Sequence, residues 1–107
     1  MGRYLLIWEL DPTRVPVNPQ ERGGAWAVLT EMVKQDLKKG TLKDWGSFIG
    51  EGSGYAVAEG TEVEVVTALQ RYVPYVYFQT HPVATVNQIG EVIKALSAKK
   101  PERRRRK

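Results

Sequence analysis

The stretch "RYLLIWEL", residues 3–10, carries large apolar side chains at both odd and even positions. Successive side chains of a β-strand point to opposite faces of its sheet. Leu6 and Trp8 therefore belong to one face of the expected strand, and Leu5 and Ile7 belong to the other. A strand of this kind needs a covering layer on each of its two faces.

A second stretch, "YVPYVYFQTHPVA", residues 72–84, has the same property. Tyr75 and Tyr77 alternate with Val76 and Phe78, so bulky groups again point to both sides of a strand. The chain thus contains at least two strands that are apolar on both faces.

Helix caps divide the rest of the chain. Asn18 followed by Pro19 is typical of a helix start. Thr61 and Thr85 each precede a Glu or Gln by three residues, which is the spacing of a capping box. The helices expected from these starts span 19–39, 61–73 and 85–96. The buried stripe expected from helical spacing is Trp26, Leu29, Val33 and Leu37 in the first helix, and Val63, Val66, Leu69 and Val73 in the second.

Two more strands, 41–50 and 54–60, are expected to form a hairpin around a glycine-rich turn. The order of elements is then β-α-β-β-α-β-α. Right-handed crossovers turn the first six elements into a ferredoxin-like sheet of four antiparallel strands with both helices on one face. The predicted fold class is α+β, with an extra C-terminal helix.

Two helices cover only one face of such a sheet. The other face would expose an apolar patch on the order of several hundred Å², which is more than monomers usually tolerate. Helix 85–96 can fold back over it, or the open face can pack against the same face of a second copy. Because that helix has a single apolar stripe, sufficient for about two strands, we favour a homodimer in which it closes an edge or reaches the partner.

Charge is distributed unevenly along the 107 residues. The tail 99–107, "KKPERRRRK", holds seven of the 16 basic residues and one of the 12 acidic residues, so the body is slightly acidic. We expect one domain over 1–98 followed by a basic, disordered tail, because runs of like charge usually stay solvated. Binding of nucleic acid through the tail is the less favoured interpretation.

The sequence shows no clear signal for insertion into a membrane or for secretion. No apolar run is long enough to cross a bilayer, so no membrane partner is expected. The start "MGRYLLIWELDP" lacks the length and cleavage site of a signal peptide, and the chain contains no cysteine. These features favour a cytoplasmic protein.

The pattern of strands and helices, with "KDWGSFIGEGSGYAVAEG" in the middle and "LQRYVPYVYFQTHPV" near the end, resembles the dimeric α+β barrel superfamily. Within it, the chain is most similar to small muconolactone-isomerase-like proteins. It is also similar to a group of short, uncharacterised bacterial and archaeal proteins with a "WELDP" start and an "HPV" end. The resemblance spans about residues 3–96 and implies two sheets packed face to face. The superfamily contains isomerases, cofactor-free monooxygenases, cyclases, haem enzymes and sensing domains, so it does not specify a reaction.

His81 is the only histidine in the chain. An imidazole at a strand end beside a pocket can transfer protons near neutral pH. The resemblance implies a similar part for histidine in some relatives, but a single histidine does not provide the two-histidine sites that others use. The alternative is a structural imidazole bonded to backbone or water. We expect no metal and no cofactor.

Two acidic residues, Glu9 and Asp44, lie in strand patterns that are otherwise rich in large apolar groups. A carboxylate pointing into a barrel would have a raised pKa and could act as a general base. At a strand end it would be a solvated charge, which is the commoner case.

Aromatic residues could line a pocket for a planar ligand, because rings stack and phenols form hydrogen bonds with carbonyl groups. Packing in the core or at a dimer interface is the favoured alternative. The candidates are Trp8, Trp45, Tyr55, Tyr75 and Tyr77.

The first functional hypothesis is an enzyme or binder of a small cyclic or aromatic carbonyl compound, with isomerase-like proton transfer and no metal. A non-catalytic ligand-sensing module, with the tail contacting nucleic acid, is one alternative. A purely structural oligomer is the other.

Overall fold

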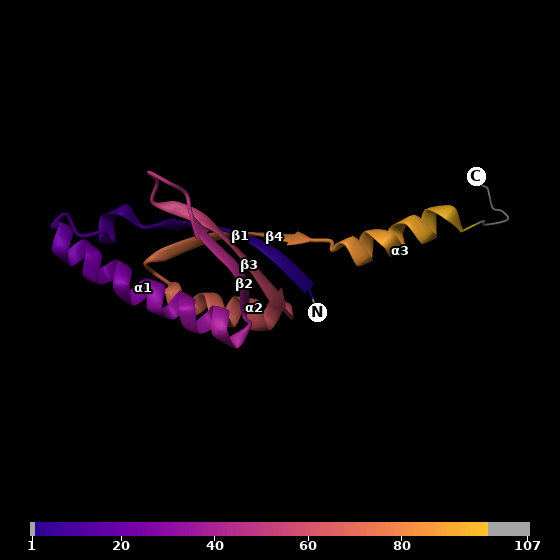
Figure 1. Ribbon diagram of the computed structural model, residues 1–107, viewed down its shortest axis with the longest axis horizontal. Helices are drawn as coiled ribbons and strands as arrows, with labels where there is room; N and C mark the ends of the chain where they lie inside the picture. Colours follow the sequence, from indigo (N-terminus) through magenta and orange to yellow (C-terminus); the bar gives the residue numbers. More distant parts are fainter. Residues whose placement is uncertain (1, 99–107) are drawn as a thin grey trace.

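The computed structural model describes residues 2–98 and shows an α+β fold with a four-stranded antiparallel sheet (Figure 1). The sheet order is β2-β3-β1-β4, as in a ferredoxin-like fold, so the predicted architecture of the single chain is confirmed. The predicted tail lies outside the described residues. The elements are β1 (Gly2–Leu10), α1 (Pro19–Lys39), β2 (Leu42–Ser47), β3 (Ser53–Gly60), α2 (Glu62–Leu69), β4 (Val76–Val83) and α3 (Val86–Ser97).

The helices begin where the caps predicted them. The Asn18 side chain accepts hydrogen bonds from the backbone N–H groups of Gln20 and Glu21 at the start of α1. Complete capping boxes start α2 at Thr61 and α3 at Thr85. These local hydrogen bonds satisfy N–H groups that have no partner within the helix.

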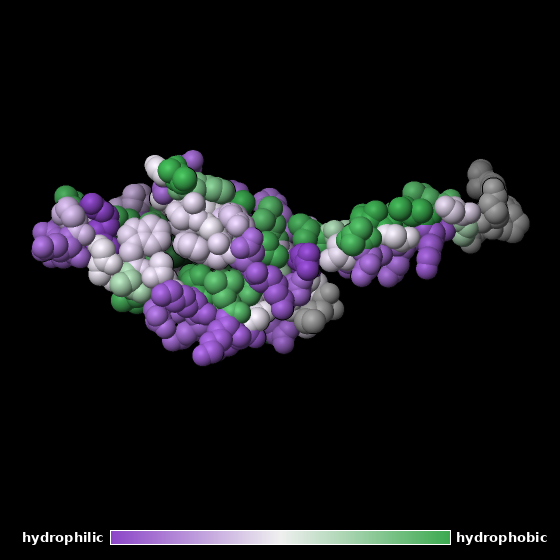
Figure 2. Space-filling model, in the orientation of Figure 1, coloured by the Kyte–Doolittle hydropathy of each residue, from purple (hydrophilic) through white to green (hydrophobic). Residues whose placement is uncertain are grey.

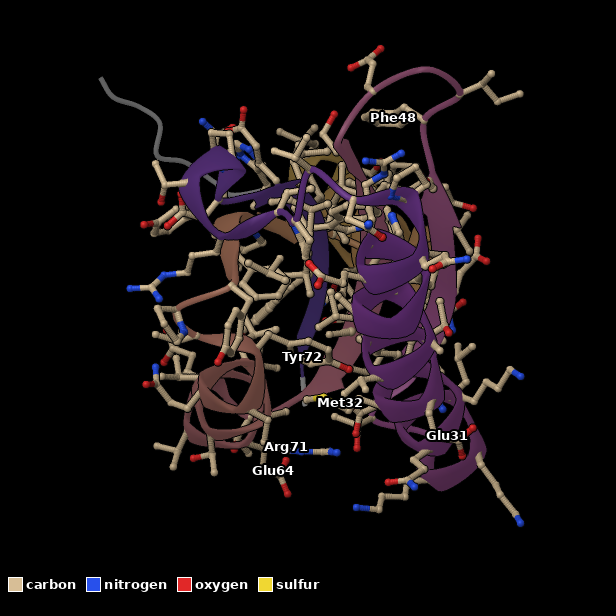
Figure 3. All side chains as sticks on the ribbon, turned by 90° about the vertical axis from the view of Figure 1, so that its left-hand side faces the viewer. Glu31, Met32, Phe48, Glu64, Arg71 and Tyr72 are labelled. Atoms are coloured by element: carbon tan, nitrogen blue, oxygen red, sulfur yellow. The ribbon has the colours of Figure 1, made fainter. Side chains whose placement is uncertain are left out.

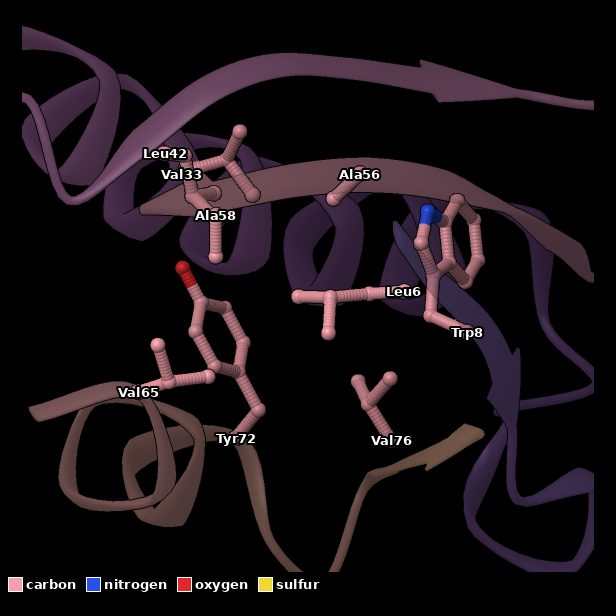
Figure 4. Close-up of a cluster of buried hydrophobic side chains, with 9 residues drawn as sticks. All are labelled: Leu6, Trp8, Val33, Leu42, Ala56, Ala58, Val65, Tyr72 and Val76. Atoms are coloured by element: carbon pink, nitrogen blue, oxygen red, sulfur yellow. The ribbon is translucent and has the colours of Figure 1, made fainter. Parts of the chain in front are cut away.

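The two faces of β1 have the predicted composition. Leu6 and Trp8 are buried against α1 and α2, in a core that continues into the alanines of β3 (Figure 4). Leu5 and Ile7 point to the opposite side and are only half-buried. Figure 1 shows α1 and α2 together on one side of the sheet. We call the other side the open face.

The buried stripe of α2 differs from the prediction. Val63, Val66 and Val73 are 75%, 56% and 50% exposed, whereas Val65 is buried. Because apolar residues are crowded into a short helix, two stripes fit the same sequence, and the one containing Val65 and Leu69 faces the core. The stripe of α1 differs in a similar way at its last position, since Leu37 is 40% exposed.

A buried acidic residue joins the two helical segments instead. Asp36 on α1 is 2% exposed and accepts hydrogen bonds from Arg71 Nη1 at 2.7 Å and from the Tyr72 hydroxyl at 2.6 Å. Figure 3 shows Arg71 and Tyr72 extending toward α1 from the chain that follows α2. A buried carboxylate is tolerated when it is paired and hydrogen-bonded in this way.

Helix α3 projects away from the rest of the chain (Figure 1). It buries no residue, and its apolar side chains gather on one side of the helix (Figure 2). Folding of this helix over the open face of its own chain is therefore not observed. No helix within residues 2–98 combines the length and the apolar character needed to cross a membrane. The exposed apolar residues of α3 are Val86, Ile89, Val92, Ile93 and Leu96.

We predict that Tyr72→Phe lowers the free energy of unfolding at neutral pH by about 1–3 kcal/mol, because it leaves a buried carboxylate oxygen without its donor. Urea denaturation measures this change. Tyr4→Phe is the matched control, since its hydroxyl has no hydrogen-bond partner among the described residues. An equal loss of stability in both variants would contradict the assignment.

The same contact predicts a pH dependence. Burial, followed by the hydrogen bond and charge of Asp36, raises the pKa of Tyr72 above its ordinary value of 10.0. A raised phenol pKa contributes stability that is complete below pH 10 and is lost as the pH rises further. The difference in free energy of unfolding between the unmodified protein and Tyr72→Phe should therefore narrow above that pH.

Candidate functional site

The open face of the sheet has an apolar centre. Leu5 on β1 lies opposite Val57 on β3, and Ile7 lies opposite Tyr55. All four of these side chains are half-buried, although α1 and α2 lie on the other side. This surface is where the chain places most of its candidate site residues.

The three residues predicted to carry proton transfer all lie on the open face. His81 is opposite Leu5, and Glu9 is opposite Tyr77. Asp44 is paired with Val57, which is itself opposite Leu5. All three are exposed. The structure thus brings together, on one side of the sheet, residues that come from three different strands.

The spacing between His81 and Glu9 limits what they can do together. The β1 residue opposite His81 is Leu5, which is four positions from Glu9. Four residues of strand correspond to about 13 Å. A proton cannot pass directly between the two side chains over that distance. Each can act only on a ligand that lies against it.

Asp44 and Tyr55 form the one direct polar pair among these candidates. The Tyr55 hydroxyl donates to Asp44 Oδ2 at 2.8 Å, and the other carboxylate oxygen accepts from the backbone N–H of Trp45, also at 2.8 Å. The hydrogen bond to Asp44, with smaller contributions from burial and from the negative charge of Asp44, raises the pKa of Tyr55. Tyr55 therefore stays protonated, and Asp44 acts to position it rather than as a free base.

Gly46 makes this pairing possible. It lies opposite Tyr55 on the neighbouring strand, and a side chain at this position would collide with the Tyr55 ring. The ring can therefore lie across β2 and reach Asp44. A glycine inside a strand was the only sequence signal of this close approach.

The predicted aromatic set does not form a single pocket. Trp8 and Trp45 stack at 5.3 Å on the covered face, where the Trp8 N–H is also bonded to backbone carbonyls of β2 and β3. Both belong to the core or pack against it. Tyr55 and Tyr77 lie on the open face, and Tyr75 precedes β4 with the Arg14 guanidinium 5.9 Å from its ring centre.

Charged residues border one end of the open face. Arg3 forms an ion pair with Glu59, and Lys43 lies 3.9 Å from the same carboxylate. The acidic and histidine side chains within residues 2–98 form no cluster of three or more that could hold a metal ion. The site is thus an apolar surface with single polar groups spread around it.

The chain matches no known protein-family model, and no curated protein matches it. The geometry and charge of the open face therefore carry the functional proposal.

We predict that Asp44→Asn lowers the pKa of Tyr55 toward its ordinary value, because the variant removes a negative charge and a strong acceptor. The measurement is a titration of tyrosinate ultraviolet absorbance, with Tyr55→Phe used to identify the transition that belongs to this residue. An unchanged titration would show that Asp44 does not control the Tyr55 phenol.

Proposed function

We propose that the protein is a homodimer in which two open faces pack together as a dimeric α+β barrel. We propose further that a small cyclic or aromatic carbonyl compound binds between the two sheets and undergoes isomerase-like proton transfer. The apolar open face that contains the sole histidine is the observation that supports this function.

Two uncovered apolar surfaces support the dimer. One is the centre of the open face, formed by Leu5, Ile7 and Val57. The other is the stripe of α3, whose residues Val86 and Leu96 are 84% and 81% exposed. Self-association through a two-fold axis buries both copies of each surface at once. The sequence resemblance to dimeric barrels favours the same arrangement.

His81 is the residue best suited to the chemistry. Imidazole is the one candidate side chain that commonly both accepts and donates a proton in acid–base catalysis. In the proposed step, it removes a proton from a carbon next to the carbonyl, the double-bond electrons shift, and the proton returns to a different carbon. The step is an isomerisation of one molecule, so it needs no oxidant and no second reactant.

A structural oligomer is the second candidate function. The separation of about 13 Å between His81 and Glu9 favours it, because the open face then lacks a paired acid and base. The bonding of both Asp44 oxygens within the chain favours it as well. In this case the open face serves association alone.

We predict that Ile7→Lys converts the dimer to a folded monomer, because each copy would bring a charge into an apolar interface. Size-exclusion chromatography with light scattering gives the mass, and circular dichroism checks the fold. Val63→Lys is the control, since Val63 is 75% exposed on α2, on the other side of the sheet. A monomeric unmodified protein at micromolar concentration would overturn the dimer.

A screen of unsaturated lactones and quinones tests the chemistry. We expect a thermal shift with at least one compound and slow isomerisation that His81→Asn reduces by about 10²–10⁴-fold in kcat, the usual contribution of a general acid–base. Thr80→Val, at the neighbouring position, should keep full activity. A stable dimer that neither binds nor converts any of these compounds would favour the structural oligomer.

A further inference from the structure

A cavity of about 280 Å³ lies beside the N-terminal half of α1, at the end of the sheet where β1 stops. Its apolar walls include Leu10 from β1, Val15 and Pro16 from the connector to α1, and Trp26 and Leu29 from α1 itself. The volume is close to that of the smaller known ligand pockets. Because α1 packs on the covered side of the sheet (Figure 1), this cavity lies apart from the apolar centre of the open face. It adjoins that face only at Asp11, which is hydrogen-bonded to Tyr77.

One carboxylate lines the cavity, and both of its oxygens already accept hydrogen bonds from the chain itself. Asp11 Oδ1 accepts from the Thr13 backbone N–H at 3.0 Å and from the Thr13 hydroxyl at 2.7 Å. Asp11 Oδ2 accepts from the Tyr77 hydroxyl at 3.3 Å. These bonds, led by those from Thr13, lower the pKa of Asp11. Asp11 therefore stays ionised and directed at its own chain.

Two guanidinium groups line the same cavity and keep donors free. The Arg14 guanidinium lies over the Tyr75 ring, with Nε 3.4 Å from Asp11 Oδ2, and makes no shorter polar contact among residues 2–98. Arg22 donates through Nη1 to the carbonyls of Pro16 and Val17. Its Nε and Nη2 have no acceptor within the described part of the chain. Both side chains are thus partly fixed and still able to bind an anion.

We propose that this cavity binds an organic monocarboxylate with a short hydrocarbon or single-ring body. The carboxylate accepts hydrogen bonds from Arg14 and Arg22, for which planar oxygen pairs are well matched acceptors. The body of the ligand packs against Trp26, Leu29 and the connector. Two guanidinium groups and one carboxylate leave the lining with one net positive charge, which complements a monoanion better than a dianion.

Calorimetric titration of the full chain with benzoate, benzamide and phenyl phosphate tests the proposal. These probes share one ring and differ in the charge of the attached group. We expect benzoate to bind at least about tenfold more tightly than benzamide, because only the anion gains charge-assisted hydrogen bonds. We also expect phenyl phosphate to bind more weakly than benzoate. Equal affinity for benzoate and benzamide, or no binding of benzoate, would overturn the proposal.

Arg14→Gln should weaken benzoate binding by about tenfold, which corresponds to one lost charged contact. Lys38→Gln is the matched control, because it removes the same charge from an exposed site at the far end of α1. Unchanged binding in Arg14→Gln would contradict the site. If circular dichroism shows that this variant does not fold, the comparison of benzoate with benzamide on the unmodified protein still tests the proposal.

The Ile7→Lys variant separates this site from the function proposed for the open face. Benzoate binding should persist in that variant, since Ile7 lies on the other side of the sheet. Loss of binding together with loss of the dimer would place benzoate between the two sheets. That result would overturn the proposal that benzoate binds in the cavity beside α1.

Discussion

The structure depends on one constraint: β1 lies between β3 and β4 and has large apolar side chains on both faces. The helices satisfy one face, where Leu6 is completely buried and Trp8 is 3% exposed. The other face has the same kind of side chain, and residues 2–98 provide no second layer over it. Hydrophobic burial is the main favourable term in folding and association, so this asymmetry is the physical basis of the proposed contact with a second copy.

The polar groups of the two faces differ in how completely they are bonded. On the covered face, Asp36 has a partner for each carboxylate oxygen, as a buried charge requires. On the open face, Asp44 accepts hydrogen bonds from the Tyr55 hydroxyl and the Trp45 backbone, whereas His81 and Glu9 have no side-chain hydrogen bond among the described residues. Among the residues predicted to carry proton transfer, the two that are free to act on a ligand are therefore on the face that lacks cover.

The sequence predicts those parts of the fold that depend on local rules. The caps at Asn18, Thr61 and Thr85 and the alternation along β1 all appear in the structure. The stripe of α2 could not be predicted, because two helical faces of "EVEVVTAL" are apolar and only tertiary packing selects between them. The division of the aromatic residues depends on strand register, and the cavity beside α1 combines groups from a connector, a helix and a distant loop. No pattern within a short window contains that information.

The stability of helix α3 also depends on what the chain packs against. The helix has 12 residues, and none of them is buried against the described part of the chain. An isolated helix of about that length is marginally stable in water, even with a favourable cap. Its capping box fixes only the first turn, so the remaining turns need a surface against which their apolar side packs. Packing of α3 on a second copy would supply that surface. The helical order of α3 would then depend on the association proposed to cover the open face of β1.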